Sequence, residues 1–268
     1  MNPDHDYRKL RRGLKDVSPL FEEGQGLPGP AAVRLECGPK SLEMVSAFSP
    51  DHPKESLKLN AHFALKLAVA DQTASIISVR SNPNAAFHGG VPLPSQARLK
   101  YLTLPWAQFE TMLAGPVAWH QVGDFPPQIF FLDFDYSQLA LMEKMIPVLD
   151  RWILLTRGTT ESLCETYKMM KAARLFHSHL EYYLVLDGDF SHEKGSYLFE
   201  RFAQLVAKNL GIHLIWLGAL ATAVNGGSQV PLVLDHLFLK PAENTCTPAK
   251  LALAHFLRSL SESPVGAS

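Results

Sequence analysis

Three short apolar segments indicate the fold class: Trp152-Ile-Leu-Leu-Thr156, Tyr182-Tyr-Leu-Val-Leu186 and His213-Leu-Ile-Trp-Leu217. Each is almost wholly apolar, which is typical of a strand buried on both faces of a sheet. The chain between consecutive segments is long enough for a helix, so each strand is followed by a crossover. Such crossovers are right-handed and make the strands parallel. We therefore predict a three-layer α/β fold, with a mostly parallel sheet and helices on both faces.

Helical signals fill both intervals between these strands. In the first, Thr160 can cap a helix whose apolar residues, Leu163 among them, share one face. In the second, Ser191 can cap a helix that ends at Gly211. The same alternation continues toward both ends of the chain, with strands expected at 42–48, 74–79, 99–104 and 128–133, and helices at 54–68, 139–149 and 248–260.

The composition of the 268 residues limits the classes of function. Apolar residues make up 47% and charged residues 19%, which supports a sizeable core. A net charge of -1 gives no long-range attraction for nucleic acid or for an anionic membrane surface. The three cysteines are too few for a disulfide framework or a cysteine-based zinc site. The apolar runs are shorter than a membrane span and the N-terminal stretch is too charged for a secretory signal, so we expect a cytoplasmic protein.

The N-terminal part of the chain differs from the rest. Gly and Pro dominate residues 22–30, a composition that does not hold regular structure. Ahead of them, Leu10, Leu14 and Phe21 are apolar points in a basic stretch and could dock on a protein partner. The expected organisation is a flexible peptide and linker over residues 1–40, an α/β domain over residues 41–262 and a tail over residues 263–268.

Ligands of parallel α/β sheets bind beyond the carboxyl ends of the strands. The first strand is followed by Ser49-Pro-Asp-His-Pro-Lys-Glu-Ser56, which contains no glycine. A loop that wraps a phosphate needs glycines, because its N–H groups must converge without obstruction by side chains. Lys54 and Ser56 could still contact an anion at the start of the next helix, although they also suit a solvated first turn.

Another strand ends at Asp133, with Asp135 two residues later. An acid at this position can hold a magnesium-bound water or an activated nucleophile, or it can cap the next helix. Residues 187–193 alternate oxygen-bearing side chains like a calcium loop, but the spacing is incomplete. We interpret that segment as a helix start, and His177, His179 and His192 as surface histidines.

The closing helix carries an apolar stripe that includes Leu253, Phe256 and Leu257. Its polar side offers only Lys250 and Arg258 as cations, which is little for binding an anionic membrane surface. We therefore favour packing of this helix on the domain over peripheral membrane contact.

The segment from Leu186 to Leu220 resembles the corresponding part of the MinD/ParA-type ATPases, in particular the flagellar-number regulators FlhG, FleN and YlxH. The strand that ends at Thr156, followed by a turn and a helix, is similar to that family as well. The resemblance covers residues 40–262. It implies a P-loop NTPase-like fold that binds ATP and magnesium.

The resemblance also assigns roles to single residues. Asn60 falls on the asparagine of the family motif Lys-Thr-Thr-x-x-x-Asn, which places Lys54 on the phosphate-loop lysine. Glu55 and Ser56 fall on the two hydroxyl positions, and Asp133 on the acid of Ile-Asp-Thr-Pro-Ala-Gly. The cofactor-binding candidates are therefore Lys54, Ser56 and Asp133.

The departures from the family pattern predict loss of ATP hydrolysis. The loop has no glycine, and the carboxylate of Glu55 would repel phosphates where the family has a magnesium-binding hydroxyl. Arg80 follows the strand at whose end the family has the acid that activates water. We therefore expect no bound cofactor, with ATP and magnesium bound only if the site is functional.

Three hypotheses follow. The first is a non-hydrolysing pseudo-ATPase that acts as a regulatory protein-interaction platform in positioning or assembly of a bacterial cell-surface apparatus. Its partner would be a protein, either a second copy of the chain or a related ATPase. The second is a divergent ATPase that uses Lys54 and Asp133. The third is a phosphatase similar to the haloacid dehalogenases, with Asp133 as the nucleophile.

Overall fold

The computed structural model describes residues 42–51, 56–69, 74–80, 99–114, 128–134, 139–188, 190–220 and 248–262. The expected N-terminal peptide and C-terminal tail lie outside these ranges. In chain order the elements are β1 (Leu42–Phe48), α2 (Ser56–Val69), β2 (Ala74–Arg80), β3 (Leu99–Pro105), α3 (Trp106–Ala114), β4 (Gln128–Asp133), α4 (Leu139–Met145), η4 (Ile146–Val148), β5 (Arg151–Arg157), α5 (Thr160–Phe176), β6 (Glu181–Asp187), α6 (His192–Leu210), β7 (Leu214–Leu220) and α8 (Pro248–Glu262).

The strands form one seven-stranded sheet in the order β3-β2-β4-β1-β5-β6-β7. Every adjacent pair of strands is parallel. The predicted α/β fold is therefore confirmed. The strand order reverses at β1, which lies between β4 and β5, and crevices for ligands form beyond the carboxyl ends of strands at such a point.

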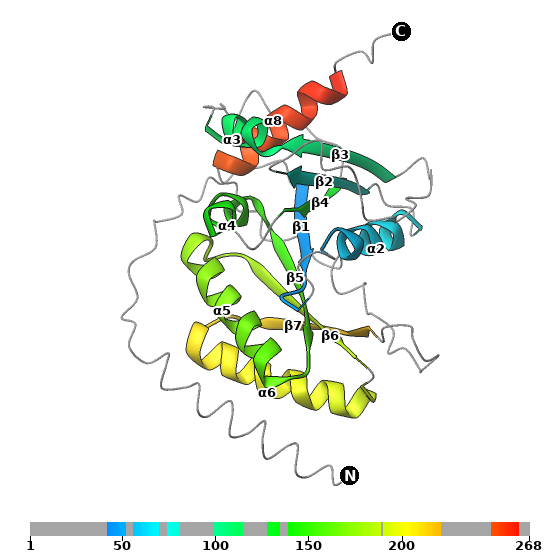
Figure 1. Cartoon of the computed structure of the whole chain (residues 1–268), viewed down its shortest axis with the longest axis vertical. Coiled ribbons are helices and arrows are strands. Elements are labelled where there is room, and N and C mark those ends of the chain that lie inside the picture. The colour runs from blue at the N-terminus through cyan, green and yellow to red at the C-terminus, as the bar shows by residue number, and fades with distance from the viewer. Residues whose placement is uncertain are drawn as a thin grey trace.

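Helices cover both faces of the sheet (Figure 1). On one face, α2 packs Phe63 and Ala64 against the strand residues Val45, Ile76 and Phe131. On the other face, a larger core joins side chains from α3, α4, α5, α6 and α8. The sheet is thus buried on both sides, which is why its strands are nearly continuous apolar runs.

All seven strands lie where the sequence predicts them. The pattern of apolar residues did not predict α3, a helix of nine residues that follows β3 directly. The helix expected over 139–149 ends as an α-helix at Met145 and continues as the short 3₁₀ turn Ile146–Val148. Pro147 lies in that turn, and its ring is incompatible with a regular helix interior.

The helix caps follow simple local chemistry. The hydroxyl of Thr159, not that of the predicted Thr160, accepts a hydrogen bond from the N–H of Ser162 at the start of α5. Ser191 caps α6 as predicted, by accepting from the N–H of Lys194. Gly211 ends α6 in the left-handed conformation, with φ of 62°, which suits a residue without Cβ.

Two predictions about exposed polar residues are wrong. His177 is buried rather than a surface residue, because the C-terminal end of α5 packs into the domain. Lys250 is also buried, 5% exposed, although the helix pattern assigned it to a polar face. The apolar stripe of α8 packs on the core as expected, with Leu253 and Leu257 buried.

Candidate functional site

Four residues from three elements, β4, β2 and α2, come together at the carboxyl edge of the sheet. Asp133 is the last residue of β4, and Ser78 of β2 lies opposite it in the strand pairing. Arg80 ends β2, two residues beyond Ser78 and on the same face of the strand. Ser56 is the first residue of α2, the helix that follows β1. We call Asp133, Ser56, Ser78 and Arg80 the carboxyl-edge cluster.

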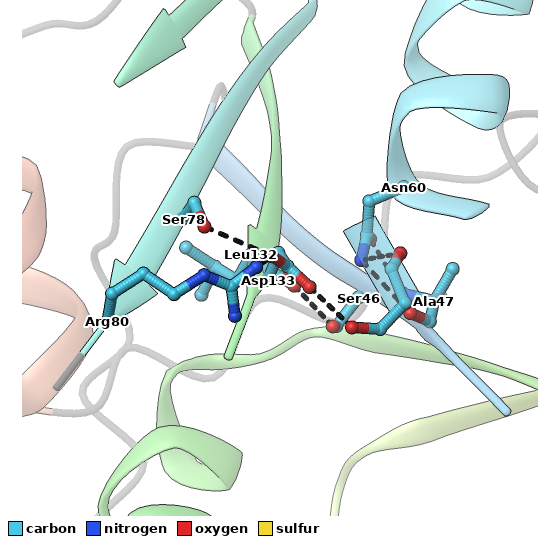
Figure 2. A network of polar contacts seen from close by, with 8 residues as sticks. Ser46, Ala47, Asn60, Ser78, Arg80, Leu132 and Asp133 are labelled. Atoms are coloured by element: carbon cyan, nitrogen blue, oxygen red, sulfur yellow. Dashed lines mark hydrogen bonds and ion pairs between the residues drawn. The ribbon is translucent and has the colours of Figure 1, made fainter. Parts of the chain in front are cut away.

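Asp133 is the centre of this cluster and is completely buried. Its Oδ1 accepts a hydrogen bond of 2.6 Å from the hydroxyl of Ser56. Its Oδ2 accepts one of 3.1 Å from the hydroxyl of Ser78 and forms an ion pair with the guanidinium of Arg80. Figure 2 shows Ser78 and Arg80 reaching Asp133 from the neighbouring strand. Both carboxylate oxygens are therefore engaged by side chains of the protein itself.

The electrostatics of Asp133 reflect two opposing effects. Burial raises the pKa of this carboxyl above its ordinary value, because removal from water disfavours the charged form. The positive charge of Arg80 and the hydroxyls of Ser56 and Ser78 act in the opposite direction. Arg80 is thus the main group that favours the ionised form of Asp133 in this buried position.

Asn60 holds α2 against the end of β1. Its Oδ1 accepts from the N–H of Ala47 at 2.8 Å, and its Nδ2 donates to the carbonyl of Ala47 at 3.0 Å. The same Nδ2 donates to the carbonyl of Ser56 at 2.9 Å. Asn60 is completely buried, and Figure 2 shows it beside Ala47. It therefore positions the first turn of α2 and, with it, Ser56 next to Asp133.

The turn after β1 is fastened on its other side by Asp51. The Oδ2 of Asp51 accepts a hydrogen bond of 3.0 Å from the N–H of Arg157 and a second from the hydroxyl of Ser162. The hydroxyl of Ser162 also lies 2.6 Å from that of Thr156. A carboxylate of the chain thus occupies the donors at the junction of β5 and α5, beside the turn in which the resemblance places the phosphate loop.

The structure brings Ser56 and Asp133 together, as expected of a shared site. Lys54 and Glu55 lie outside the described residues, as do Leu10, Leu14 and Phe21 of the expected docking peptide. The contacts of Arg80, Ser78 and Asp51 were not predicted. All three are polar residues near the carboxyl end of a strand. This position marks them as candidates for the site, but it does not identify the residues that they contact.

The calcium-like segment and the histidines do not form a metal centre in the part of the chain that the structure describes. No group of three or more His, Cys, Asp or Glu side chains there is arranged to hold a metal ion. Asp187 is buried, and its Oδ2 lies 3.9 Å from the Nε of Arg157. Asp189 lies outside the described residues.

The carboxyl-edge cluster does not fit the magnesium ion that the sequence resemblance implies. A magnesium ion needs oxygen lone pairs, usually from one or two carboxylates together with phosphates and water. Here the carboxylate oxygens of Asp133 already accept hydrogen bonds, and the adjacent Arg80 is positively charged. A divalent cation would have to displace that guanidinium or remain next to it against electrostatic repulsion.

No protein-family model matches the sequence, and no curated protein sequence matches it either. Among solved structures, a plasmid partition protein from Borrelia burgdorferi is similar, at 7% identity and a TM-score of 0.44, over 83% of this chain and 99% of that one. MinD from Aquifex aeolicus in the MinC:MinD cell division complex is similar at 13% identity and a TM-score of 0.41, over 84% of this chain and 98% of that one. The structure of MinD from the same organism gives 12% identity and a TM-score of 0.38 over 84% and 99%. These TM-scores all lie below 0.5, so the function must be inferred from the geometry of the site.

None of the helices within the described ranges is long and apolar enough to span a lipid bilayer.

Proposed function

We propose that this chain is a non-hydrolysing, MinD/ParA-like pseudo-ATPase that acts as a regulatory protein-interaction platform. The observation that carries the proposal is the saturation of Asp133 by Ser56, Ser78 and Arg80. A nucleotide site of this class uses that acid to organise a magnesium ion and water. In this chain the acid instead ties the ends of β2 and β4 to the start of α2, which is a structural role.

The sequence of the turn after β1 supports the same proposal. Its two prolines, Pro50 and Pro53, have no backbone N–H, and no glycine is present between Ser49 and Ser56. The described part of this turn includes Asp51, a carboxylate, which is directed to the donors of Arg157 and Ser162. Negative charge at this place disfavours a bound triphosphate.

The decisive experiment is a thermal-shift titration of the full chain with ATP and magnesium, together with an assay of phosphate release. A ligand present at about 100 times its Kd stabilises a protein by about 2.7 kcal/mol. For a chain of this size each kcal/mol raises Tm by about 2–4 °C. We expect no such shift and no phosphate release above that of the Asp133→Asn variant.

The alternative functions predict different results in the same assays. A divergent ATPase would show a shift of several degrees and steady release of phosphate that Asp133→Asn abolishes. A phosphatase would hydrolyse p-nitrophenyl phosphate in a reaction that is lost in Asp133→Asn. Neither is favoured by the geometry, because Asp133 is completely buried and both of its oxygens are engaged.

For the interaction itself, we propose a protein partner, either a second copy of this chain or a related ATPase. The chain would contact this partner through the apolar residues Leu10, Leu14 and Phe21. The complex would act in positioning or assembly of a bacterial cell-surface apparatus. Light scattering after size exclusion would give the mass of the full chain and of a variant with all three changed to Ser. We expect the assembly to persist without nucleotide and to be lost in this variant, whereas a control with Arg8 and Asp16 changed to Ser keeps it. An assembly that forms only with ATP would contradict the proposal.

A further inference from the structure

The end of β2 places a permanent positive charge beside a buried acid. Arg80 has a side chain that is 28% exposed, whereas the side chain of Asp133 has no exposed surface. Ser78 and Arg80 lie on the same face of β2, so both reach the adjacent end of β4. Strand pairing therefore fixes the backbone from which the Arg80 side chain extends toward Asp133.

Charge balance explains why such a contact is needed. An ionised carboxylate without exposed surface is strongly unfavourable unless a cation and hydrogen-bond donors compensate it. Hydroxyls of Ser56 and Ser78 supply hydrogen bonds, but neither carries charge. Among the described contacts of Asp133, only Arg80 supplies a full positive charge.

We infer that Arg80 is a tethered cation that replaces a divalent metal ion at Asp133, so that the carboxyl-edge cluster is held in one charge state without metal. Guanidinium and metal ion exclude each other there, because both need the lone pairs of the same carboxylate and like charges repel. The inference deepens the proposed function and rests on it: regulation of this chain would not pass through metal or nucleotide at this edge.

Removing the guanidinium of Arg80 should open the site beside Asp133 to a divalent cation. In Arg80→Ser, Asp133 keeps the hydroxyls of Ser56 and Ser78, and the space beside Oδ2 opens to a cation. Carboxylate and hydroxyl oxygens are ligands that Mn²⁺ and Mg²⁺ accept. The variant should therefore become sensitive to divalent cations, whereas the natural chain is not.

The experiment measures Tm of the full chain with and without MnCl₂ or MgCl₂, against NaCl of equal ionic strength, and measures free Mn²⁺ by its EPR signal. We expect the natural chain to be unaffected and to leave the Mn²⁺ signal unchanged. We expect Arg80→Ser to melt at a lower temperature, to regain part of the loss with Mn²⁺ or Mg²⁺ but not NaCl, and to reduce the free Mn²⁺ signal. Arg80→Lys, which keeps a cation, should behave like the natural chain.

A variant that carries Arg80→Ser together with Asp133→Asn separates charge from folding. This double variant has neither the carboxylate nor the guanidinium, so we expect it to fold. Its Tm and the free Mn²⁺ signal should not change when divalent cations are added. Mn²⁺ binding by the natural chain, or an Arg80→Ser variant whose Tm does not respond to Mn²⁺, would overturn the inference. If Arg80→Ser does not fold by itself, the test is whether Mn²⁺ restores its folding. Restored folding would support the inference, and a variant that stays unfolded with Mn²⁺ would contradict it.

These outcomes are distinct from a failure of the proposed function. A natural chain that binds ATP without magnesium would contradict the pseudo-ATPase proposal and leave the role of Arg80 intact. A natural chain that does not bind ATP but binds Mn²⁺ would leave the pseudo-ATPase proposal intact and contradict the role of Arg80.

Discussion

Lys250 of α8 forms a buried ion pair with Asp150, the residue that precedes β5. The Nζ of Lys250 lies 2.6 Å from Oδ1 and 2.7 Å from Oδ2 of Asp150, and both residues are at most 5% exposed. The same carboxylate accepts the N–H of Met44 in β1 at 2.8 Å. The final helix is thus joined to the amino edge of the two central strands, at the opposite end of the sheet from the carboxyl-edge cluster.

Replacing Lys250 with Met should destabilise the domain. Removing one partner of a buried ion pair leaves the other charge uncompensated, at a cost of about 3–5 kcal/mol. The free energy of unfolding, measured by circular dichroism in urea, should fall by that amount. Lys168→Met, which removes an exposed pair with Glu165, is the control and should change it by about 0.5 kcal/mol or less. Equal effects of the two variants would show that the Lys250 pair does not hold α8.

Asn60→Ala should also weaken the fold, because Asn60 makes three hydrogen bonds without being exposed to water. The N–H of Ala47 would lose its acceptor in a buried position, which costs about 1–3 kcal/mol. Urea denaturation measures the loss. Gln204→Ala, on the exposed side of α6, is the matched control and should leave the midpoint within experimental error. If the two variants unfolded at the same urea concentration, the proposed role of Asn60 would be wrong.

His177 should make the protein less stable in acid. Burial, together with the nearby His179 and Lys250, lowers the pKa of His177 from 6.5 to about 4. Between these values the unfolded chain binds a proton that the folded chain does not, so stability falls as pH decreases from 6.5 to 4. His177→Gln should remove up to about 3 kcal/mol of this dependence. The measurement is the free energy of unfolding at several pH values, with the exposed His213→Gln as control. A His177→Gln profile parallel to that of the natural chain would contradict this.

Glu43 should have the opposite pH dependence. Burial raises its pKa from 4.5 to about 7, although the guanidinium of Arg151 lies 2.6 Å from its Oε1 and lowers the pKa in part. The folded chain therefore holds a proton that the unfolded chain releases between pH 4.5 and 7, and the associated stability is lost as pH rises through 7. Relative to the natural chain, Glu43→Gln should gain up to about 3 kcal/mol from pH 4.5 to pH 8.

The check for Glu43 uses the same unfolding measurements over the same pH range. The exposed Glu165→Gln serves as the matched control variant. Because His177 and Glu43 act in opposite directions between pH 4.5 and 6.5, their effects largely cancel in the natural chain. A steep slope in the natural chain that neither variant alters would falsify both assignments.

The strands and most of the helices could be predicted because their signals are local. An apolar run such as Trp152–Thr156 indicates a buried strand, and a residue such as Ser191 or Gly211 marks a helix end through its own backbone chemistry. Where a local signal was weak or ambiguous, prediction failed. The short α3 was missed, and Lys250 was assigned to a polar face because its partner lies 100 residues away.

The carboxyl-edge cluster could be predicted only in part. Ser56 and Asp133 follow from the rule that sites lie beyond strand ends, and the structure joins them. The sequence does not predict the ion pair between Arg80 and Asp133, because an arginine at the end of a strand can equally well be solvated. The adjacency of β2 and β4, which have β3 between them in sequence, decides that contact.

Local sequence patterns were enough to predict the alternation of strands and helices and the parallel sheet that this alternation requires. Those properties depend on neighbouring residues, whose spacing and conformational preferences act over a few positions. The three-dimensional fold was needed to show that Ser56, Ser78 and Arg80 surround Asp133, because they are separated from it by 77, 55 and 53 residues. Contacts over such separations depend on strand order and register. Because Asp133 is buried, each of these contacts affects the free energy of its ionised form.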